Sequence, residues 1–199
     1  MDLQHASVGP ADNNAYLLVD SGEALLIDAA ADPLTLLALI GDTPVTAIVT
    51  THRHADHLGA LAALAHHTGA RLVAGAPDAD AIEAAAGVVI DDRVWTSDRV
   101  RVGRVELEVI GLVGHTPGSI ALAHSPADGP VRLFTGDSLF PGGVGKTRSP
   151  ADFDSLYTDV TTRLFDRFDD GTEVWPGHGR PTTLGAERPH LAEWRARGW

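Results

Sequence analysis

The chain of 199 residues contains no cysteine, only one methionine and only one lysine, Lys146. Without cysteine it can form neither a disulfide framework nor a thiolate nucleophile, and no thiolate can ligate a metal ion. Basic residues are also few, because 15 of them face 27 acidic residues and the formal net charge is -12. An acidic balance of this size argues against nucleic acid or an anionic membrane as the partner.

Long hydrophobic runs are absent as well. No apolar stretch reaches the roughly 18 residues of a membrane-spanning helix, and the segment from Met1 to His5 lacks the basic start of a secretory signal. We therefore expect a cytoplasmic protein. No linker, repeat or low-complexity tract interrupts the sequence, and its length is that of one ordinary domain, so we expect residues 1–199 to form a single domain.

Short apolar segments predict strands, and longer segments with apolar residues at helical spacing predict helices. The predicted strands are 16–19, 24–28, 45–50, 71–74, 105–109, 120–123, 131–134 and 173–175. The predicted helices are 33–40, 58–69, 150–168 and 186–197, the first with Asp32 as N-cap and Pro33 at its first position. Both halves combine strands with helices, which predicts an α+β fold of two packed sheets with helices outside them.

The chain has ten histidines, although aromatic residues make up only 6% of it. Three of them fall between Thr51 and His57, a segment that reads Thr-His-Arg-His-Ala-Asp-His and directly follows the predicted strand 45–50. A loop that leaves a strand can turn alternate side chains toward one point, and imidazole and carboxylate are ligands that first-row divalent metal ions accept. We interpret the segment as a metal-binding loop, with a solvated polar turn as the alternative.

Three further candidates follow predicted strands one at a time. His115, Asp137 and His178 lie one to three residues beyond an apolar segment, each directly after a glycine. A lone histidine in such a turn is more often a surface residue. The joint placement of the three favours a common edge of the sheets, where pockets are often built. The other histidines lack clustered partners and are expected to be structural or solvent-facing: His5, His66, His67, His124 and His190.

The segment 51–57, followed in order by the later histidine, aspartate and histidine, resembles the metallo-β-lactamase superfamily and, within it, the glyoxalase II-like hydrolases. The resemblance extends from Asn14 to Gly179 and implies a four-layer αββα sandwich with two divalent metal ions. It also implies that His52, His54 and His115 hold one ion, that Asp56, His57 and His178 hold the second, and that Asp137 bridges them.

The function that this resemblance implies is hydrolysis of a small thioester or ester. Two ions, with zinc favoured and iron or manganese as alternatives, would lower the pKa of bound water to about 7 and supply a hydroxide nucleophile. Asp56 would orient this water or carry its proton, and Lys146, in the Gly-Lys segment after the aspartate, would contact an anionic small-molecule substrate. Only 21 residues follow His178. Because glyoxalase II proteins of the human type carry a long helical extension there that helps to bind glutathione, a smaller thioester or an ester fits the sequence equally well.

Two other functions remain open. A persulfide dioxygenase resembles the same ligand set but binds one iron and oxidises a thiol-derived substrate, and a metal-stabilised binding protein would keep the ligands without turnover. The glycine-rich segment from Gly142 to Thr147 superficially suggests a phosphate loop, but that pattern requires glycine where this chain has Phe140. The sequence therefore argues against nucleotide binding.

Overall fold

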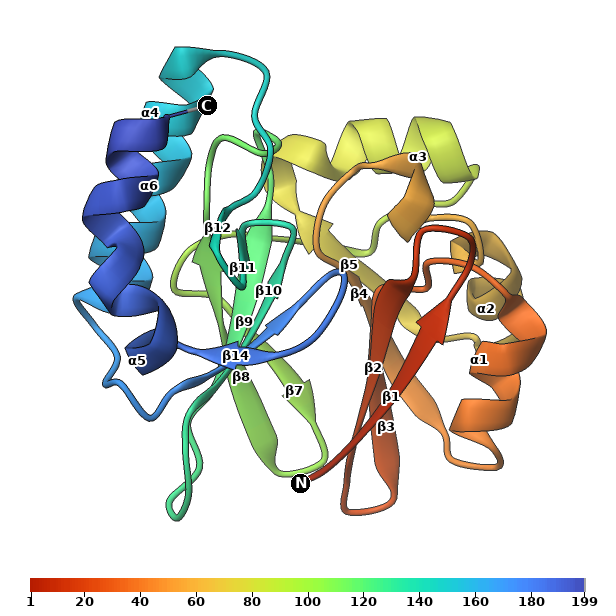
Figure 1. Ribbon diagram of the computed structural model, residues 1–199. Coiled ribbons are helices and arrows are strands. Elements are labelled where there is room, and N and C mark those ends of the chain that lie inside the picture. The colour runs from red at the N-terminus through yellow and green to blue at the C-terminus, as the bar shows by residue number, and fades with distance from the viewer. Residues whose placement is uncertain (199) are drawn as a thin grey trace.

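Two six-stranded sheets pack face to face in the computed structural model, which describes residues 1–198 (Figure 1). The first sheet has the order β1-β2-β3-β4-β5-β6, with bounds Asp2–Val8, Asn13–Asp20, Glu23–Ile27, Val45–Thr50, Arg71–Gly75 and Asp92–Val94. The second has the order β14-β13-β10-β9-β8-β7, with bounds Thr182–Thr183, Glu173–Pro176, Arg132–Gly136, Ile120–His124, Val105–Gly111 and Arg99–Val102. A separate small hairpin joins β11 (Leu139–Phe140) and β12 (Gly143–Val144).

Helices cover the outer face of each sheet (Figure 1). The first sheet is covered by α1 (Pro33–Ile40), α2 (Leu61–Thr68) and α3 (Ala79–Ala86). The second is covered by α4 (Pro150–Val160), α5 (Leu184–Glu187) and α6 (Leu191–Arg197). The fold is therefore the expected four-layer αββα sandwich of class α+β.

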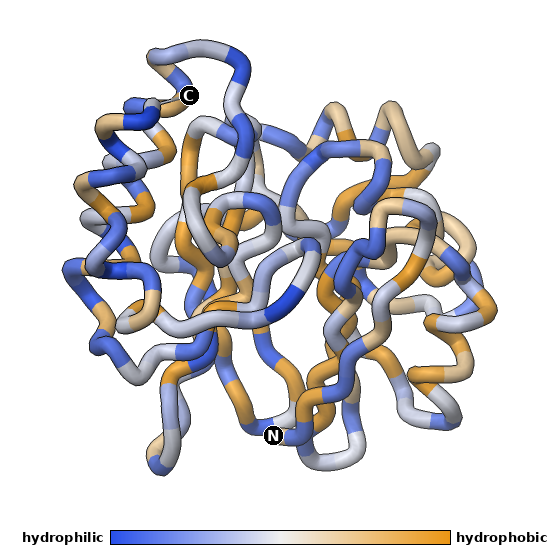
Figure 2. Tube along the Cα trace, in the orientation of Figure 1, coloured by the Kyte–Doolittle hydropathy of each residue, from blue (hydrophilic) through white to orange (hydrophobic). Residues whose placement is uncertain are grey.

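Three hydrophobic clusters lie between the four layers of helices and sheets. A central strand contributes to two of them, because neighbouring side chains in a strand point to opposite faces of the sheet. In β3, Leu26 packs under the helices with Leu36 of α1, whereas Leu25 packs between the sheets with Val109 of β8. Both faces of the central strands are thus buried, which explains why they read as continuous apolar runs rather than as alternating ones. Figure 2 shows the hydrophobic segments running along the strands and recurring along the helices.

Several element boundaries differ from those predicted. The second predicted helix begins later, because a 3₁₀ turn at Ala55–His57 precedes α2. The helix predicted over 150–168 leaves α-helical geometry after Val160 and continues as a wider π-type turn to Phe165. The helix predicted over 186–197 is divided into α5, a short 3₁₀ turn and α6.

Asp32 occupies the predicted N-cap position and Pro33 begins α1 as expected, but the Asp32 side chain makes no capping hydrogen bond. Its carboxylate instead accepts from the backbone N–H of Gly9 at 2.8 Å, and so ties the loop after β1 to the start of the helix.

The strands that precede the candidate residues end at one shared edge. Strands β10 and β13 are parallel neighbours, and the backbone N–H of Gly177 donates to the carbonyl of Gly136 at 2.8 Å just beyond them. The carbonyl of Gly177 in turn accepts from the N–H of Asn14 in β2, at 2.7 Å. A second link joins the sheets, from the N–H of Ile120 to the carbonyl of Thr51 at 2.9 Å. These links hold the loops of both sheets against each other at this edge.

Candidate metal centre

The loop after β4 turns its histidines toward one point. The side chains of His52 and His57 are buried, and His54 is half-buried. The Nε2 atom of His52 lies 3.1 Å from Nδ1 of His54. The predicted metal-binding loop therefore does present several imidazoles together, and it is not a solvated turn.

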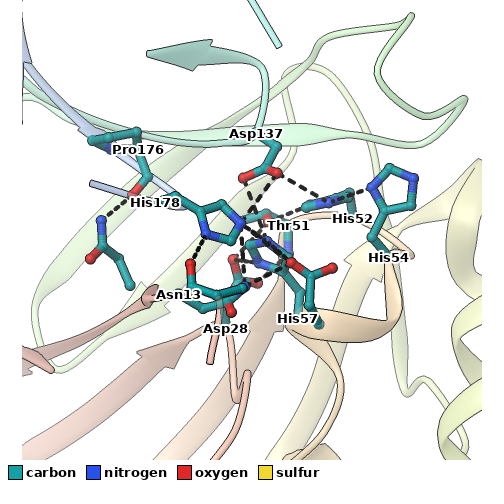
Figure 3. A network of polar contacts seen from close by, with 12 residues as sticks. Asn13, Asp28, Thr51, His52, His54, His57, Asp137, Pro176 and His178 are labelled. Carbon is teal, nitrogen blue, oxygen red and sulfur yellow. Dashed lines mark hydrogen bonds and ion pairs between the residues drawn. The ribbon is translucent and has the colours of Figure 1, made fainter. Parts of the chain in front are cut away.

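The three isolated candidates reach the same point from the second sheet. The Nε2 atom of His115 lies 3.3 Å from that of His52, and the Nε2 atom of His178 lies 3.3 Å from that of His57. The Asp137 carboxylate lies between them, 3.5 Å from Nε2 of His57 and 3.6 Å from Nε2 of His115. Figure 3 shows Asp137 and His178 approaching the histidines of the first sheet from the opposite side.

Asp56 completes the cluster. Its Oδ2 lies 3.3 Å from Nε2 of His178 and accepts a hydrogen bond from the side-chain amide of Asn13 at 3.0 Å. The structure thus brings together all seven residues predicted as metal ligands. Their donor atoms form three overlapping groups within 4.8 Å, namely His52, His54 and His115; His52, His57 and Asp137; and Asp56, His57 and His178.

Glycines allow this close approach at two positions. A Cβ at Gly177 would lie 2.2 Å from Oδ1 of Asp137, and a Cβ at Gly145 would lie 1.8 Å from the Asp137 carbonyl oxygen. Both distances are far shorter than any real contact, so any larger residue would force Asp137 or its neighbours to move. These two glycines therefore let the backbone come close to Asp137.

Asp28 orients the cluster from beneath and was not predicted from the sequence. Its buried carboxylate accepts from the backbone N–H of Thr51, from the Thr51 hydroxyl and from Nδ1 of His57, each at 2.8 Å. With its Nδ1 proton held by Asp28, His57 presents Nε2 to the centre. Asp28 directly follows β3, so the strand-end rule that found Asp137 could have found it.

Other histidines of the cluster are oriented by backbone carbonyls. Nδ1 of His115 lies 2.7 Å from the carbonyl oxygen of Lys146, and Nδ1 of His178 lies 2.9 Å from that of Ala11. In each case the bonded Nδ1 fixes the ring so that Nε2 faces the cluster, as second partners of metal-bound histidines do.

Asp78 braces the two loops that carry His52, His54 and His115, and it too was not predicted. This fully buried carboxylate accepts from the N–H of Arg53 at 3.1 Å, from the N–H of Gly118 at 3.0 Å and from the hydroxyl of Thr116. It lies at the start of α3, and its sequence neighbours give no sign of contact with the loop 51–57.

The electrostatic environment prepares these groups to bind cations. Burial, followed by the nearby His57, lowers the pKa of His52 well below its usual value, and burial and His115 lower the pKa of His54. Burial alone would raise the pKa of Asp137, but its interactions with His178 and His57 outweigh burial and hold that pKa below the usual range. At neutral pH His52 and His54 are therefore neutral imidazoles and Asp137 is an ionised carboxylate, whereas the hydrogen bond to Asp137 raises the pKa of His178.

His57 also differs from His52 and His54. Burial opposes a charge on His57, but the carboxylates of Asp28 and Asp137 together outweigh burial and raise the pKa of His57 to about 10. A metal ion that binds its Nε2 must therefore displace a proton.

The donor set fits divalent metal ions. Oδ1 of Asp137 is buried and has no hydrogen-bond partner among residues 1–198, although buried polar atoms are almost always paired. Around it, imidazole nitrogens of neighbouring histidines lie only 3.1–3.3 Å from one another. Nitrogen and oxygen donors arranged in this way are those that zinc, iron and manganese accept.

Comparison with known proteins agrees with this geometry. The sequence profile of the metallo-beta-lactamase superfamily matches residues 8–178. The chain belongs to the metallo-β-lactamase superfamily. The hydroxyacylglutathione hydrolase of Polaromonas sp. is 38% identical over 170 residues, which cover 83% of this chain and 62% of the relative. The chain thus spans about three fifths of the length of that relative.

Two other superfamily members align over most of both chains. The hydroxyacylglutathione hydrolase GloC of Haemophilus influenzae is 28% identical, and the match covers 94% of this chain and 95% of GloC. The crystal structure of TTHA1623 in a di-iron-bound form superposes with a TM-score of 0.73 at 32% identity, covering 93% of this chain and 96% of that one.

Lys146, the predicted substrate contact, lies beside the cluster in this superfamily member. Its side chain is exposed and borders a cavity of about 180 Å³ that is also lined by His54, His115, Thr147 and Arg148. Arg53 and Arg148 border a neighbouring cavity, and sequence reasoning assigned a role to neither. In the described part of the chain no helix has the length and apolar character needed to cross a membrane.

Proposed function

We propose that this protein is a metal-dependent hydrolase that cleaves a small thioester. The observation that carries the proposal is the convergence of seven imidazole and carboxylate side chains from loops of both sheets. In the proposed assignment His52, His54 and His115 hold one ion, Asp56, His57 and His178 hold the second, and Asp137 lies between the ions. A related structure of 32% identity that is described as di-iron-bound supports two ions at such a site.

Divalent ions at this position would lower the pKa of a bound water molecule and polarise a substrate carbonyl. The surrounding residues have separate tasks. Asp28 holds the proton on Nδ1 of His57 and keeps Nε2 free, and Asn13 donates to Asp56 and fixes the direction of its carboxylate. No serine or cysteine nucleophile is required.

Asp56 is the proposed catalytic residue. Burial would raise its pKa, but the hydrogen bond from Asn13 and the charge of His57 lower it below the usual value, so that the carboxylate is ionised at neutral pH. Its side chain is 44% exposed and opens to solvent. An ionised carboxylate at this position can orient a water molecule and accept its proton at Oδ.

The relatives support the proposed substrate class. Two of them are hydroxyacylglutathione hydrolases, and one of the two matches this chain over 95% of its own length. We propose a thioester of a small acyl group as the substrate and zinc as the resident ion, with iron or manganese compatible with the same ligands. The single-domain organisation and the cytoplasmic location stay predictions from the sequence.

The test combines elemental analysis of the gently purified protein with hydrolysis of a panel of thioesters and esters and with measurement of oxygen uptake. We expect two divalent ions per chain, thioester hydrolysis and no oxygen uptake. His54→Ala should lose metal and activity together, whereas His190→Ala, on the exposed 3₁₀ turn before α6, should lose neither. One iron per chain with oxygen consumed on a persulfide would replace the hydrolase by a dioxygenase. Full metal without turnover of any substrate would favour the binding protein.

A further inference from the structure

Two cavities lie next to each other beside His115. One has a volume of about 250 Å³ and is lined by Arg53, His115, Thr116, Arg148 and Asp152, among others. The second, of about 180 Å³, is lined by His54, His115, Lys146, Thr147 and Arg148. His115 and Arg148 border both cavities, so the space extends from the candidate metal centre past Arg148 toward Arg53. Figure 3 shows that His54 lies at the end of the cluster away from His178, which places this space on the His54 side.

Arg148 supplies a positive charge to this space that the protein itself does not neutralise. Its side chain is exposed, and it forms no ion pair within residues 1–198. Its charge reaches the cluster, because it contributes to the lowered pKa of His54. In a chain with a net charge of -12, an unpaired arginine beside a candidate active site is a specific attraction for anions.

The other charged groups that line the larger cavity are already engaged. Nε of Arg53 lies 3.6 Å from the buried carboxylate of Asp78, and Arg53 also lines the cavity. The Asp152 carboxylate accepts from the hydroxyl of Ser149 at 2.8 Å. An incoming anion would therefore meet the guanidinium of Arg148, the guanidinium of Arg53 that lies beside Asp78, and the Asp152 carboxylate, which keeps its negative charge.

We propose that Arg148, assisted by Arg53, binds a carboxylate on the thiol portion of the substrate while the thioester carbonyl lies at the cluster. The planar guanidinium forms paired hydrogen bonds with a carboxylate, which a lysine cannot do. Arg148 is then a specificity-determining residue, and the preferred substrates are thioesters of carboxylate-bearing thiols. This inference rests on the proposed function for the identity of the substrate, but its binding test does not require turnover.

The test uses the metal-loaded protein and S-hexylglutathione, a thioether that cannot be hydrolysed. Its diethyl ester, in which both carboxylates are neutral, is the matched ligand, and calorimetry gives Kd for each. We expect Arg148→Gln to weaken binding of S-hexylglutathione about tenfold or more, to leave binding of the diethyl ester within about twofold, and to keep the wild-type metal content. Arg148→Lys should restore part of the affinity. The control Arg99→Gln, an exposed arginine on β7, should change neither Kd.

Three results would overturn the carboxylate site. These are an unchanged Kd for S-hexylglutathione in Arg148→Gln, an equal loss for both ligands, or a wild-type protein that does not prefer the charged ligand. The hydrolase proposal is judged separately by thioester turnover. Charge-dependent binding without turnover would support the carboxylate site and argue against the hydrolase function. Turnover and a Kd that are both unaffected by Arg148→Gln would support the hydrolase function and argue against the carboxylate site.

Discussion

Replacement of Asp28 by asparagine isolates the role of a residue that touches the ligands but is not one itself. Asp28 has a φ of 58°, a conformation that asparagine adopts more readily than most residues, so the backbone should not change. The asparagine carbonyl can still accept from the N–H of Thr51. Its amide group would face Nδ1 of His57 as a donor where the carboxylate was an acceptor.

The expected consequence is a change of tautomer in His57. To avoid two facing donors, Nδ1 becomes the acceptor and the proton moves to Nε2, the atom that faces the centre. Loss of such an orienting partner typically lowers metal affinity by roughly 10- to 100-fold, or about 1.4–2.7 kcal/mol. The loss should fall on the ion assigned to Asp56, His57 and His178, because Asp28 makes no hydrogen bond to His54 or His115.

Competitive chelator titration followed by elemental analysis measures this loss ion by ion. Asp28→Asn should release one ion at a chelator concentration that leaves both in the wild type, and thioester hydrolysis should fall with it. Asp91→Asn is the matched control, since the exposed Asp91 also accepts a backbone N–H, from Leu72 at 2.8 Å, but contacts none of the cluster residues. Retention of two tightly bound ions by Asp28→Asn would refute the orienting role.

Three further predictions concern the packing and protonation of the cluster. Gly177→Ala, whose Cβ would lie 2.2 Å from Oδ1 of Asp137, should lose more than tenfold in metal affinity. The control Gly171→Ala, with its nearest contact at 3.5 Å, should bind metal normally. Elemental analysis of both variants measures the difference in bound metal. Asp78→Asn should destabilise the protein by about 3 kcal/mol and lower Tm by roughly 6–12 °C. The cause is that one of the two buried acceptor oxygens of Asp78 would be replaced by an amide group that donates. A Tm within about 2 °C of wild type would contradict this. Since the pKa of His57 is raised to about 10, affinity for the ion that it binds should rise about tenfold per pH unit between roughly pH 7 and 9, and a flat affinity profile would exclude proton displacement. The same raised pKa stabilises the metal-free protein below the unfolded value of about 6.5, and this stabilisation should disappear as pH rises through about 10.

Much of the fold was predictable because burial on both faces leaves a clear pattern. The runs 24–28 and 45–50 read as buried strands, and they are the central strands β3 and β4 between two hydrophobic layers. Elements without such a pattern were missed. Strands β6, β7 and β14 have only three, four and two residues, too few to show a period. Helix α3 is rich in alanine and buries only Ala79 and Ile82, so its apolar face is faint in the sequence.

Other segments were missed for different reasons. Strand β1 has five of its seven residues polar or small, because one of its faces is largely exposed. The hairpin of β11 and β12 consists of two-residue strands. Its glycine-rich sequence invited a comparison with a phosphate loop, whereas the structure uses Gly145 to bring the chain close to Asp137.

The sequence by itself determined which residues gather at the cluster, because each of them is a metal-binding residue type placed just beyond a strand. Strand ends meet at sheet edges, so the location of such residues along the chain already limits where they lie in space. Only the tertiary structure decided which residues support them. Asp78 and Arg148 look like ordinary turn or surface residues until the two sheets pack together, and the contacts of Asp28 depend on the pairing of β3 with β4. Their roles depend on contacts between distant segments, and the local sequence records a residue's chemistry but not the neighbours that packing brings to it.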